Sequence, residues 1–331
     1  MDGRPIDADV VYRYRLVDAI ADGHAKTLQV HRFEPRGAET VFDIHWPDGR
    51  VEEVVGRDAL LKIIDDERKL ARITARSDES ILHVVRVVAA RLAEQRKRLR
   101  TVRPRVLFAA MGERHADQIA RVANKLGIRT ESLHHTMPST TIRALRDRFE
   151  REGGDLDALV HLRMLGQGYD HPPITVVVPL RPYGSFGEFY QFLGRGVRAI
   201  RGRDGGHEAA PSEQVLDIVF HAELMLDEHF RSLQREDFDP LPGALEDELA
   251  SEDVDGSGSR LLTVAYSPDA VVVQESGVVV SHPVHDVELR AKQQDERERE
   301  ALAQQYARYA QANQNPVPFE QFVRVMRSLR G

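Results

Sequence analysis

The residues of this sequence best suited to bind an anion are Arg195 and Arg198, which stand three positions apart. Residues three and four apart lie on one side of a helix, so a helix here would align both arginines with Gln191 and Gly194. Each guanidinium presents a planar set of donors that matches phosphate oxygens, and glycine leaves room for a ligand to approach. The pattern Gln-x-x-Gly-Arg-x-x-Arg therefore indicates an anion-binding helix face.

A helix is expected at this place because Ser185 and Glu188 have the spacing of a capping box, in which each side chain satisfies an amide of the first turn. The alternative interpretation is a basic surface helix whose arginines pair with acidic neighbours. The spacing alone does not separate the two interpretations.

A second motif, Met-Leu-Gly-Gln-Gly-Tyr-Asp-His-Pro-Pro over residues 164–173, precedes this helix and lies between two expected strands. Glycines after a strand allow tight turns, and the carboxylate of Asp170 could bind ribose hydroxyls at the carboxyl edge of a sheet. A plain loop between strands is the alternative for this motif taken alone.

In this order, the pieces resemble the second RecA-like domain of superfamily 2 helicases, especially the type I and III restriction-subunit and DEAD/DEAH-like branch. Residues 105–110 resemble the strand of motif IV, residues 164–173 resemble motif V, and residues 191–198 match motif VI in full. The resemblance covers residues 105–201, and residues 12–23 weakly resemble the segment that follows motif III.

The resemblance implies that ATP binds between two RecA-like lobes, of which this chain supplies the second. Arg195 and Arg198 would then be arginine fingers that stabilise charge on the transferring phosphoryl group, and Gln191 would position water or phosphate. The nucleotide-binding positions that the resemblance implies are Gly168, Asp170 and Gly194.

Nucleic acid is the second partner that the resemblance implies, DNA more than RNA. Residues 91–105 hold seven Lys or Arg residues against one acid, a run that could follow phosphates or could equally form a solvated helix face. Motif V commonly has Thr or Ser at the position of Gly166, where the hydroxyl contacts a phosphate. Glycine has no such group, which weakens a nucleic-acid contact at this position. The expected nucleic-acid-binding residues are Gly166, His135, Thr136, Arg96 and Arg98.

The sequence contains no Gly-x-x-x-x-Gly-Lys-[Ser/Thr], so no P-loop is available to hold the ATP phosphates. The segment Gly23–Thr27 has Lys26 and Thr27 without the preceding glycine pattern. The chain thus resembles the C-terminal half of a helicase, as a split subunit, a truncated product or a remnant. A P-loop-containing lobe or subunit, which would also hold most of the Mg²⁺, is the expected partner.

Three functions stay open at this level. The first is the C-terminal lobe of an ATP-dependent helicase or translocase that does not hydrolyse ATP alone. The second is a non-catalytic nucleic-acid- or protein-binding module derived from such a lobe, and the third is an inert truncation product.

Composition narrows the class of protein further. The net charge of −7 excludes a uniformly basic nucleic-acid-coating protein, although a local basic groove remains compatible with it. The absence of cysteine excludes disulfides, Cys-ligated metal and a Cys nucleophile, and no metal site is expected from the histidines. No apolar run is long enough to span a membrane, so a soluble cytoplasmic protein is expected.

The expected fold class is α/β, with a RecA-like parallel sheet covered by helices over residues 105–222. An α+β segment with a β-hairpin, residues 1–104, would precede it. An acidic linker, a small β element and a charged helical tail, residues 223–331, would follow. The expected strands are 40–46, 50–55, 105–110, 128–133, 156–162, 174–178 and 215–220, with a β element in 261–280; the expected helices are 57–70, 78–100, 114–126, 139–152, a helix from 185, and 286–310.

Overall fold

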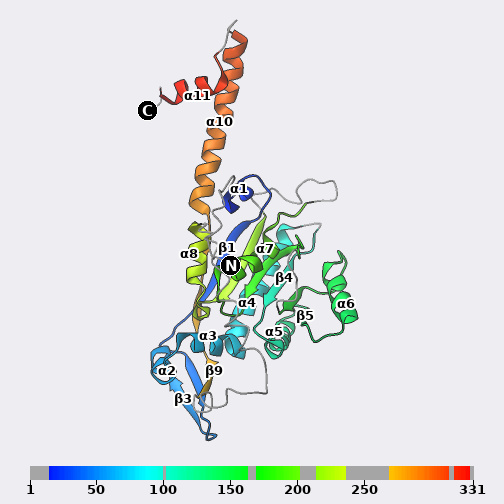
Figure 1. The fold of residues 1–331 in the computed structure, drawn as a ribbon, viewed down its shortest axis with the longest axis vertical. Helices are drawn as coiled ribbons and strands as arrows, with labels where there is room; N and C mark the ends of the chain where they lie inside the picture. Colours follow the sequence, from blue (N-terminus) through cyan, green and yellow to red (C-terminus); the bar gives the residue numbers. More distant parts are fainter. Residues whose placement is uncertain are drawn as a thin grey trace, which may run out of the picture. The chain divides into compact units, whose positions relative to one another are not determined.

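The computed structural model describes residues 15–99, 102–162, 169–201, 214–235, 268–312 and 317–328. By their contacts the residues form two compact units, one of Met1–Asp22 with His285–Gly331 and the other of Gly23–Val284. Figure 1 shows the elements, which are, in chain order, α1 (Leu16–Ala21), β1 (Thr27–Pro35), β2 (Val41–His45), β3 (Val51–Val55), α2 (Arg57–Ile64), α3 (Glu67–Arg76), α4 (Asp78–Arg98), β4 (Arg105–Ala109), α5 (Glu113–Lys125), β5 (Thr130–Leu133), α6 (Ser139–Glu150), β6 (Ala158–His161), β7 (Ile174–Pro179), α7 (Phe186–Val197), β8 (Val215–His221), α8 (Asp227–Arg235), β9 (Asp269–Gln274), β10 (Gly277–Pro283), α10 (Asp286–Ala312) and α11 (Phe319–Ser328).

The unit Gly23–Val284 is built on a seven-stranded sheet with the order β10-β1-β8-β7-β4-β6-β5. Every neighbouring pair is parallel except β1 and β10, which are antiparallel. Strands β4, β6 and β7 are buried along their whole length, which is why they read as continuous apolar runs. The expected α/β class with helices over a mostly parallel sheet is confirmed.

Helices cover both faces of this sheet. Gln95 of α4 reaches the carboxylate of Asp217 on β8, with Nε2 2.6 Å from Oδ2. Gly196 of α7 lies against Leu216, the residue that precedes Asp217 on β8. Because successive residues of a strand point to opposite faces, α4 and α7 lie on opposite faces of the sheet.

The sheet extends beyond the range 105–222 that the sequence indicated. Strand β1 inserts beside β8, and β10 adds the outer antiparallel strand, so the N-terminal and C-terminal parts of the unit share one sheet. The β element expected in residues 261–280 is not one small module, since β9 joins one sheet and β10 the other. The division at residues 104 and 222 stays a prediction.

Two other expectations change in detail. The helix expected over residues 57–70 is two helices, because Asp65 adopts a left-handed conformation (φ 47°) and ends α2. Asp66 then caps α3 by accepting a hydrogen bond from the Arg68 amide at 2.8 Å. Helices α8 and α11 were not predicted, and the acidic stretch 236–255 lies outside the described residues.

The expected hairpin is confirmed. Strands β2 and β3 pair antiparallel around the turn at Pro47–Gly49, where Gly49 has φ 85°. Strand β9 pairs with the other side of β2, giving a three-stranded sheet of order β3-β2-β9. Phe42 and Ile44 of β2 pack with side chains of α2 and α3 in a separate small core.

The unit of Met1–Asp22 and His285–Gly331 contains α1, α10 and α11. Helices α10 and α11 meet through aromatic rings: Tyr306 and Tyr309 of α10 pack against Phe319 and Phe322 of α11, with ring centroids 5.3 to 5.4 Å apart. The helical tail expected over residues 286–310 is therefore present and continues into a second helix.

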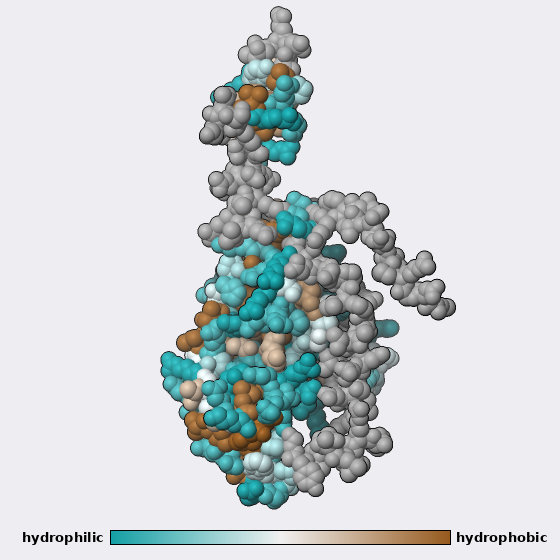
Figure 2. Space-filling view, turned by 60° about the vertical axis from the view of Figure 1, so that its left-hand side comes forward, coloured by the Kyte–Doolittle hydropathy of each residue, from teal (hydrophilic) through white to brown (hydrophobic). Residues whose placement is uncertain are grey.

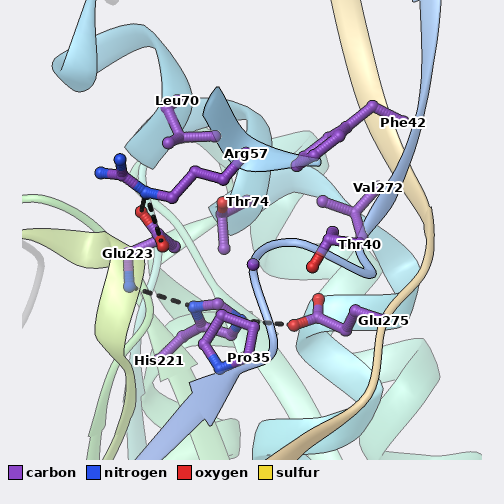
Figure 3. Close-up of a pocket in the computed structure, with 11 residues that line it drawn as sticks. Pro35, Thr40, Phe42, Arg57, Leu70, Thr74, His221, Glu223, Val272 and Glu275 are labelled. Carbon is purple, nitrogen blue, oxygen red and sulfur yellow. Dashed lines mark hydrogen bonds and ion pairs between the residues drawn. The ribbon is translucent and has the colours of Figure 1, made fainter. Parts of the chain in front are cut away.

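The two sheets of the larger unit are joined through Glu275, which lies between β9 and β10 and is 6% exposed. Its carboxylate accepts hydrogen bonds from Ser80 Oγ at 2.5 Å and pairs with His221 Nε2 at 2.8 Å. Figure 3 shows this pair in a small pocket between the sheets, with Arg57 bound to Glu223 on its other side. Burial alone would raise the pKa of Glu275, but the hydrogen bonds from His221 and Ser80 hold this pKa below its usual value.

We expect Glu275→Ala to lower the free energy of unfolding by about 3–5 kcal/mol, because it leaves His221 and Ser80 buried without their partner. The stabilisation by Glu275 is present above the pKa of an unfolded glutamate, near 4.5, and is lost as the pH falls through the lower pKa of the folded state. Urea unfolding of both proteins from pH 7 down to about pH 3 measures this. Glu53→Ala, an exposed glutamate of β3, is the matched control; equal effects of the two substitutions would contradict the account.

Candidate functional site

Helix α7 carries Gln191, Gly194 and Arg195 of the predicted anion-binding row, whereas Arg198 follows the helix as its C-cap residue, with φ −59° and ψ 134°, and is not on the helix face as expected. The N-cap of α7 is Ser185, whose Oγ accepts a hydrogen bond from the Glu188 amide at 3.3 Å, and the Glu188 carboxylate pairs with Arg181. The buried side of the helix is apolar: Phe189 packs against Phe230 of α8 with ring centroids 5.0 Å apart, and Phe192 stacks on His161 of β6. The helix expected from residue 185 is confirmed, with the Ser185 half of the expected capping box, whereas the Glu188 carboxylate binds Arg181.

Two glycines of α7 have different surroundings. A Cβ on Gly194 would meet no atom within 4 Å, so this position faces open space, as a ligand-facing glycine must. A Cβ on Gly196 would lie 2.6 Å from Leu216 Cδ1 and 3.1 Å from Val177 Cγ1. The close approach of helix to sheet therefore depends on Gly196, which the sequence pattern did not single out.

The end of α7 brings both arginines to the segment that contains Asp170. The Arg198 guanidinium pairs with the Asp170 carboxylate, and Arg195 Nη1 lies 3.4 Å from the carbonyl oxygen of Tyr169. The Arg198 side chain is 68% exposed and that of Asp170 is 29% exposed, so this pair is open to solvent. The structure thus joins three of the predicted site residues in one place.

A buried lysine, Lys26, lies behind this pair. The residue is 0% exposed, and its ammonium donates to three backbone carbonyls. They are those of Pro172 at 2.8 Å, Gly196 at 2.7 Å and Arg198. All three N–H donors of the ammonium are thereby used. One side chain therefore ties the segment after Asp170 to the end of α7.

Backbone hydrogen bonds strengthen the same junction. The Lys26 amide donates to the Val197 carbonyl at 2.7 Å, and the Ala199 amide donates to the His24 carbonyl at 3.0 Å. The Ile200 amide donates to Gln214 Oε1 at 2.6 Å, and Gln214 Nε2 donates to the Ile200 carbonyl at 3.1 Å. The residues after α7 are therefore held from two sides.

Electrostatics at the junction follow from burial. Burial lowers the pKa of Lys26 to about 7, against the influence of Asp170, which raises it. Burial also lowers the pKa of Arg195. Among the described residues, Lys26, Arg195 and Arg198 lie near one carboxylate, that of Asp170, so this part of the site carries more positive than negative charge at and below pH 7.

His161, at the end of β6, lies next to this helix. Its ring stacks on Phe192 at 5.5 Å and is fully buried, with neither ring nitrogen hydrogen-bonded in the described part of the chain. Burial, and then the charges of Arg195 and Arg181, lower the pKa of His161 to about 3. The imidazole is therefore neutral and adds no charge to the site.

The site lies at the amino edge of the parallel strands, and this corrects the sequence analysis, which placed Asp170 at the carboxyl edge. Lys26 immediately precedes β1, and Pro172 lies just ahead of β7. The reason is topological: the connection from β6 must return to the starting edge of β7 because the strands are parallel. Asp170 sits near the end of that return.

Of the other predicted residues, only some can be placed relative to the arginine pair. Gln191 is exposed on α7, upstream of Arg195 on the same helix. Gly166 and Gly168 lie outside the described residues. His135 and Thr136 are exposed in the turn after β5, at the carboxyl edge of the sheet.

Arg96 and Arg98, the candidates from the basic run, lie at the opposite end of the strands. The Arg96 guanidinium donates to the buried carboxylate of Asp157 at 2.6 Å, and Arg103 and Arg129 bind the same carboxylate. Asp157 immediately precedes β6, so this cluster is at the amino edge, whereas His135 is at the carboxyl edge. Among the described residues, the predicted nucleic-acid positions therefore lie at two different edges of the sheet.

Sequence reasoning noticed Lys26 only as an incomplete P-loop and did not assign it a role. A lone lysine ahead of a strand carries no local signal for burial, since its three acceptors are contributed by residues far along the chain. Among the described residues no group of three acidic or histidine side chains could hold a metal ion, and no helix is long and apolar enough to cross a membrane.

We expect Lys26→Met to lower the free energy of unfolding at pH 7 by about 2 kcal/mol, because three buried carbonyls lose their donor. Between pH 7 and 10 the unfolded chain holds a proton on Lys26 that the folded chain has released. The stability of the wild type should therefore rise with pH relative to the variant.

Chemical unfolding across this pH range measures both effects. Lys62→Met, at an exposed position of α2, is the matched control and should change stability by no more than about 0.5 kcal/mol at any pH. If the two variants show the same pH profile, Lys26 is not buried as described.

Comparison with known proteins identifies the domain. Residues 90–200, about a third of the chain, match the family model of the helicase conserved C-terminal domain. No curated protein matches the chain.

Solved structures show distant likeness. A fragment of a putative HsdR subunit of a type I restriction enzyme from Vibrio vulnificus YJ016 has a TM-score of 0.44 and 20% identity, over 66% of this chain and 36% of the fragment. The Mycobacterium smegmatis helicase Lhr has a TM-score of 0.34 and 15% identity, over 47% of this chain and 20% of that protein. The Escherichia coli DEAD-box protein SrmB has a TM-score of 0.35 and 16% identity, over 55% of this chain and 93% of that protein. The chain thus spans about a third or less of the first two proteins. By the family match it carries a helicase conserved C-terminal domain in residues 90–200, as the resemblance to superfamily 2 helicases predicted.

Proposed function

We propose that this chain is the second lobe of an ATP-dependent nucleic-acid helicase or translocase, acting on DNA. In this proposal Arg195 and Arg198 reach the phosphates of an ATP that a P-loop-containing first lobe holds. The observation that carries it is the junction at the end of α7, where Lys26 ties the Asp170 segment to the two arginines. Asp170, Arg195 and Arg198 lie inside the match to the helicase C-terminal domain, and Lys26 lies outside it.

The donor set of the site fits a nucleotide phosphate. Two guanidiniums are held by one helix end, and Arg198 is mostly exposed, so its fork can turn from Asp170 to a more highly charged phosphate. Gly194 leaves space beside them, and Gln191 lies on the same helix. Asp170, released from Arg198, would be free to accept hydrogen bonds from ribose hydroxyls, and Gly168 belongs to the same motif.

The charges supplied here would stabilise the transferring phosphoryl group rather than bind the nucleotide by themselves. Lys26 cannot replace a P-loop lysine, because its three donors are already used by backbone carbonyls. The described residues hold no acidic cluster for Mg²⁺, so the metal would belong to the first lobe. ATP hydrolysis is therefore expected only when that lobe is present.

For nucleic acid, the proposal assigns the exposed positions His135 and Thr136 at one sheet edge and Arg98 at the other. Gly166 of motif V is also proposed to contact the nucleic-acid backbone. Arg96 contributes less, since its guanidinium already binds Asp157. Binding is expected to weaken as salt rises, because the basic side chains displace counterions from phosphates.

The test is ATP hydrolysis with single-stranded DNA, comparing this chain alone, a P-loop lobe alone and the two together, starting with the product of the neighbouring gene. We expect hydrolysis only from the pair, and a fall of about 10³-fold or more for Arg195→Ala and for Arg198→Ala. Binding of nucleotide to the P-loop lobe should stay unchanged.

Arg36→Ala is the matched control, since Arg36 is an exposed arginine remote from α7 in the sequence and pairs only weakly, at 3.8 Å from Glu39. Hydrolysis by the pair that survives both arginine variants would contradict the arginine-finger assignment. Salt-dependent DNA binding without hydrolysis from any pair would instead favour the non-catalytic binding module.

A further inference from the structure

The outermost strand of the large sheet, β10, pairs on one side only. Its register with β1 is continuous over Gly277–Pro283, without a bulge. The ladder is bounded by two hydrogen bonds, from the Arg36 amide to the Ser276 carbonyl at 2.7 Å and from the Val284 amide to the Leu28 carbonyl at 3.0 Å. No described strand pairs with the other side of β10.

Those two bonds determine which peptide groups of β10 point outward. In an antiparallel pair, hydrogen-bonded and non-hydrogen-bonded positions alternate. Because the positions at both ends are hydrogen-bonded, Val279 and Ser281 are non-hydrogen-bonded positions, and their N–H and C=O groups face away from β1. The short contact between Ser281 Oγ and His31 Nδ1, 2.8 Å, agrees, since side chains are closer at such positions.

The other sheet edges carry charges that discourage pairing, and β10 does not. Strand β5 contains Glu131, which binds Arg148 at 3.4 Å. Strand β3 contains Glu52 and Glu53, and β9 begins with Asp269. Strand β10 has no charged residue from Gly277 to Pro283, and its proline comes last. Natural proteins protect free edges with charges, prolines or bulges, so an unprotected edge indicates a pairing site.

Three consecutive valines of β10 are exposed, and they alternate between the two faces of the strand. Val278 is 51%, Val279 46% and Val280 37% exposed. Figure 2 shows that hydrophobic surface on this side of the molecule is confined to patches within a mainly hydrophilic face. Three consecutive exposed valines on a free edge match a partner that is itself a β-strand with apolar side chains.

We propose that β10 pairs antiparallel with β10 of a second copy of this chain, around a two-fold axis at Val280, so that the two large sheets become one. Val279 of each copy then lies opposite Ser281 of the other, and each of these residues donates and accepts a hydrogen bond. A second copy fits because the outward groups are symmetric about Val280 and the strand has no charge that would repel its own copy. This interface does not depend on the proposed helicase function.

Sedimentation velocity over roughly 1 to 100 µM tests the pairing, a range in which a micromolar dimer dissociates. We expect a concentration-dependent dimer in the wild type. Val278→Lys places two added charges at the interface, and Val279→Pro removes only an outward-facing N–H and spares the bonds to β1. Each should weaken dimerisation about ten-fold or more.

Val51→Lys is the matched control, since Val51 is an exposed valine on the edge strand β3, and it should leave the dimer unchanged. Amide exchange by NMR identifies the mode of pairing. The amides of Val279 and Ser281 should exchange quickly in the monomer and slowly in the dimer, and those of Val278 and Val280 slowly in both.

A monomer at all concentrations would overturn the proposal, and so would a dimer that both β10 variants leave intact. If the amides of Val279 and Ser281 are protected even in the monomer, another segment of the chain covers the edge and the proposal is equally wrong. Circular dichroism of each variant confirms that it is folded before these results are compared.

Discussion

The structure around the candidate site depends on one buried ammonium group. Lys26 is fully buried, and its ammonium donates to carbonyls of two segments that both lie far from Lys26 in the sequence. Burial disfavours the charge and lowers the pKa of Lys26 to about 7, and the three carbonyls replace the hydrogen bonds to water that burial removes. The same group holds the end of α7 and the segment after Asp170, so the placement of Arg198 beside Asp170 follows from it.

The seven-stranded sheet places Lys26 where it can bind both the end of α7 and the segment after Asp170. Because β1 inserts beside β8, the residues ahead of β1 come to the edge where α7 ends and where the chain enters β7. Gly196 lets α7 lie close to the sheet. On the opposite face, Glu275 links β9 and β10 to the sheet through His221. The candidate site and the three-stranded sheet are thus both attached to the seven-stranded sheet by buried polar contacts.

Much of this fold was predictable from the sequence, because strand and helix periodicity from β4 to β8 is local. The cap at Ser185 and the turn at Gly49 were also predictable from nearby residues. The place of β1 was not, since parallel pairing joins residues far apart in the chain. The arginine row was visible as a motif, whereas the role of Lys26 depends on carbonyls that only tertiary structure brings together.

The central claim is that Lys26 acts on the proposed chemistry through Arg198. A double-mutant cycle of Lys26→Met and Arg198→Ala, read out as ATP hydrolysis by the chain together with its P-loop lobe, tests this most directly. Residues that act through one another are non-additive. The account predicts that Lys26→Met strongly reduces hydrolysis in the wild-type background and changes it little once Arg198 is alanine. Independent, additive effects of the two substitutions would contradict it.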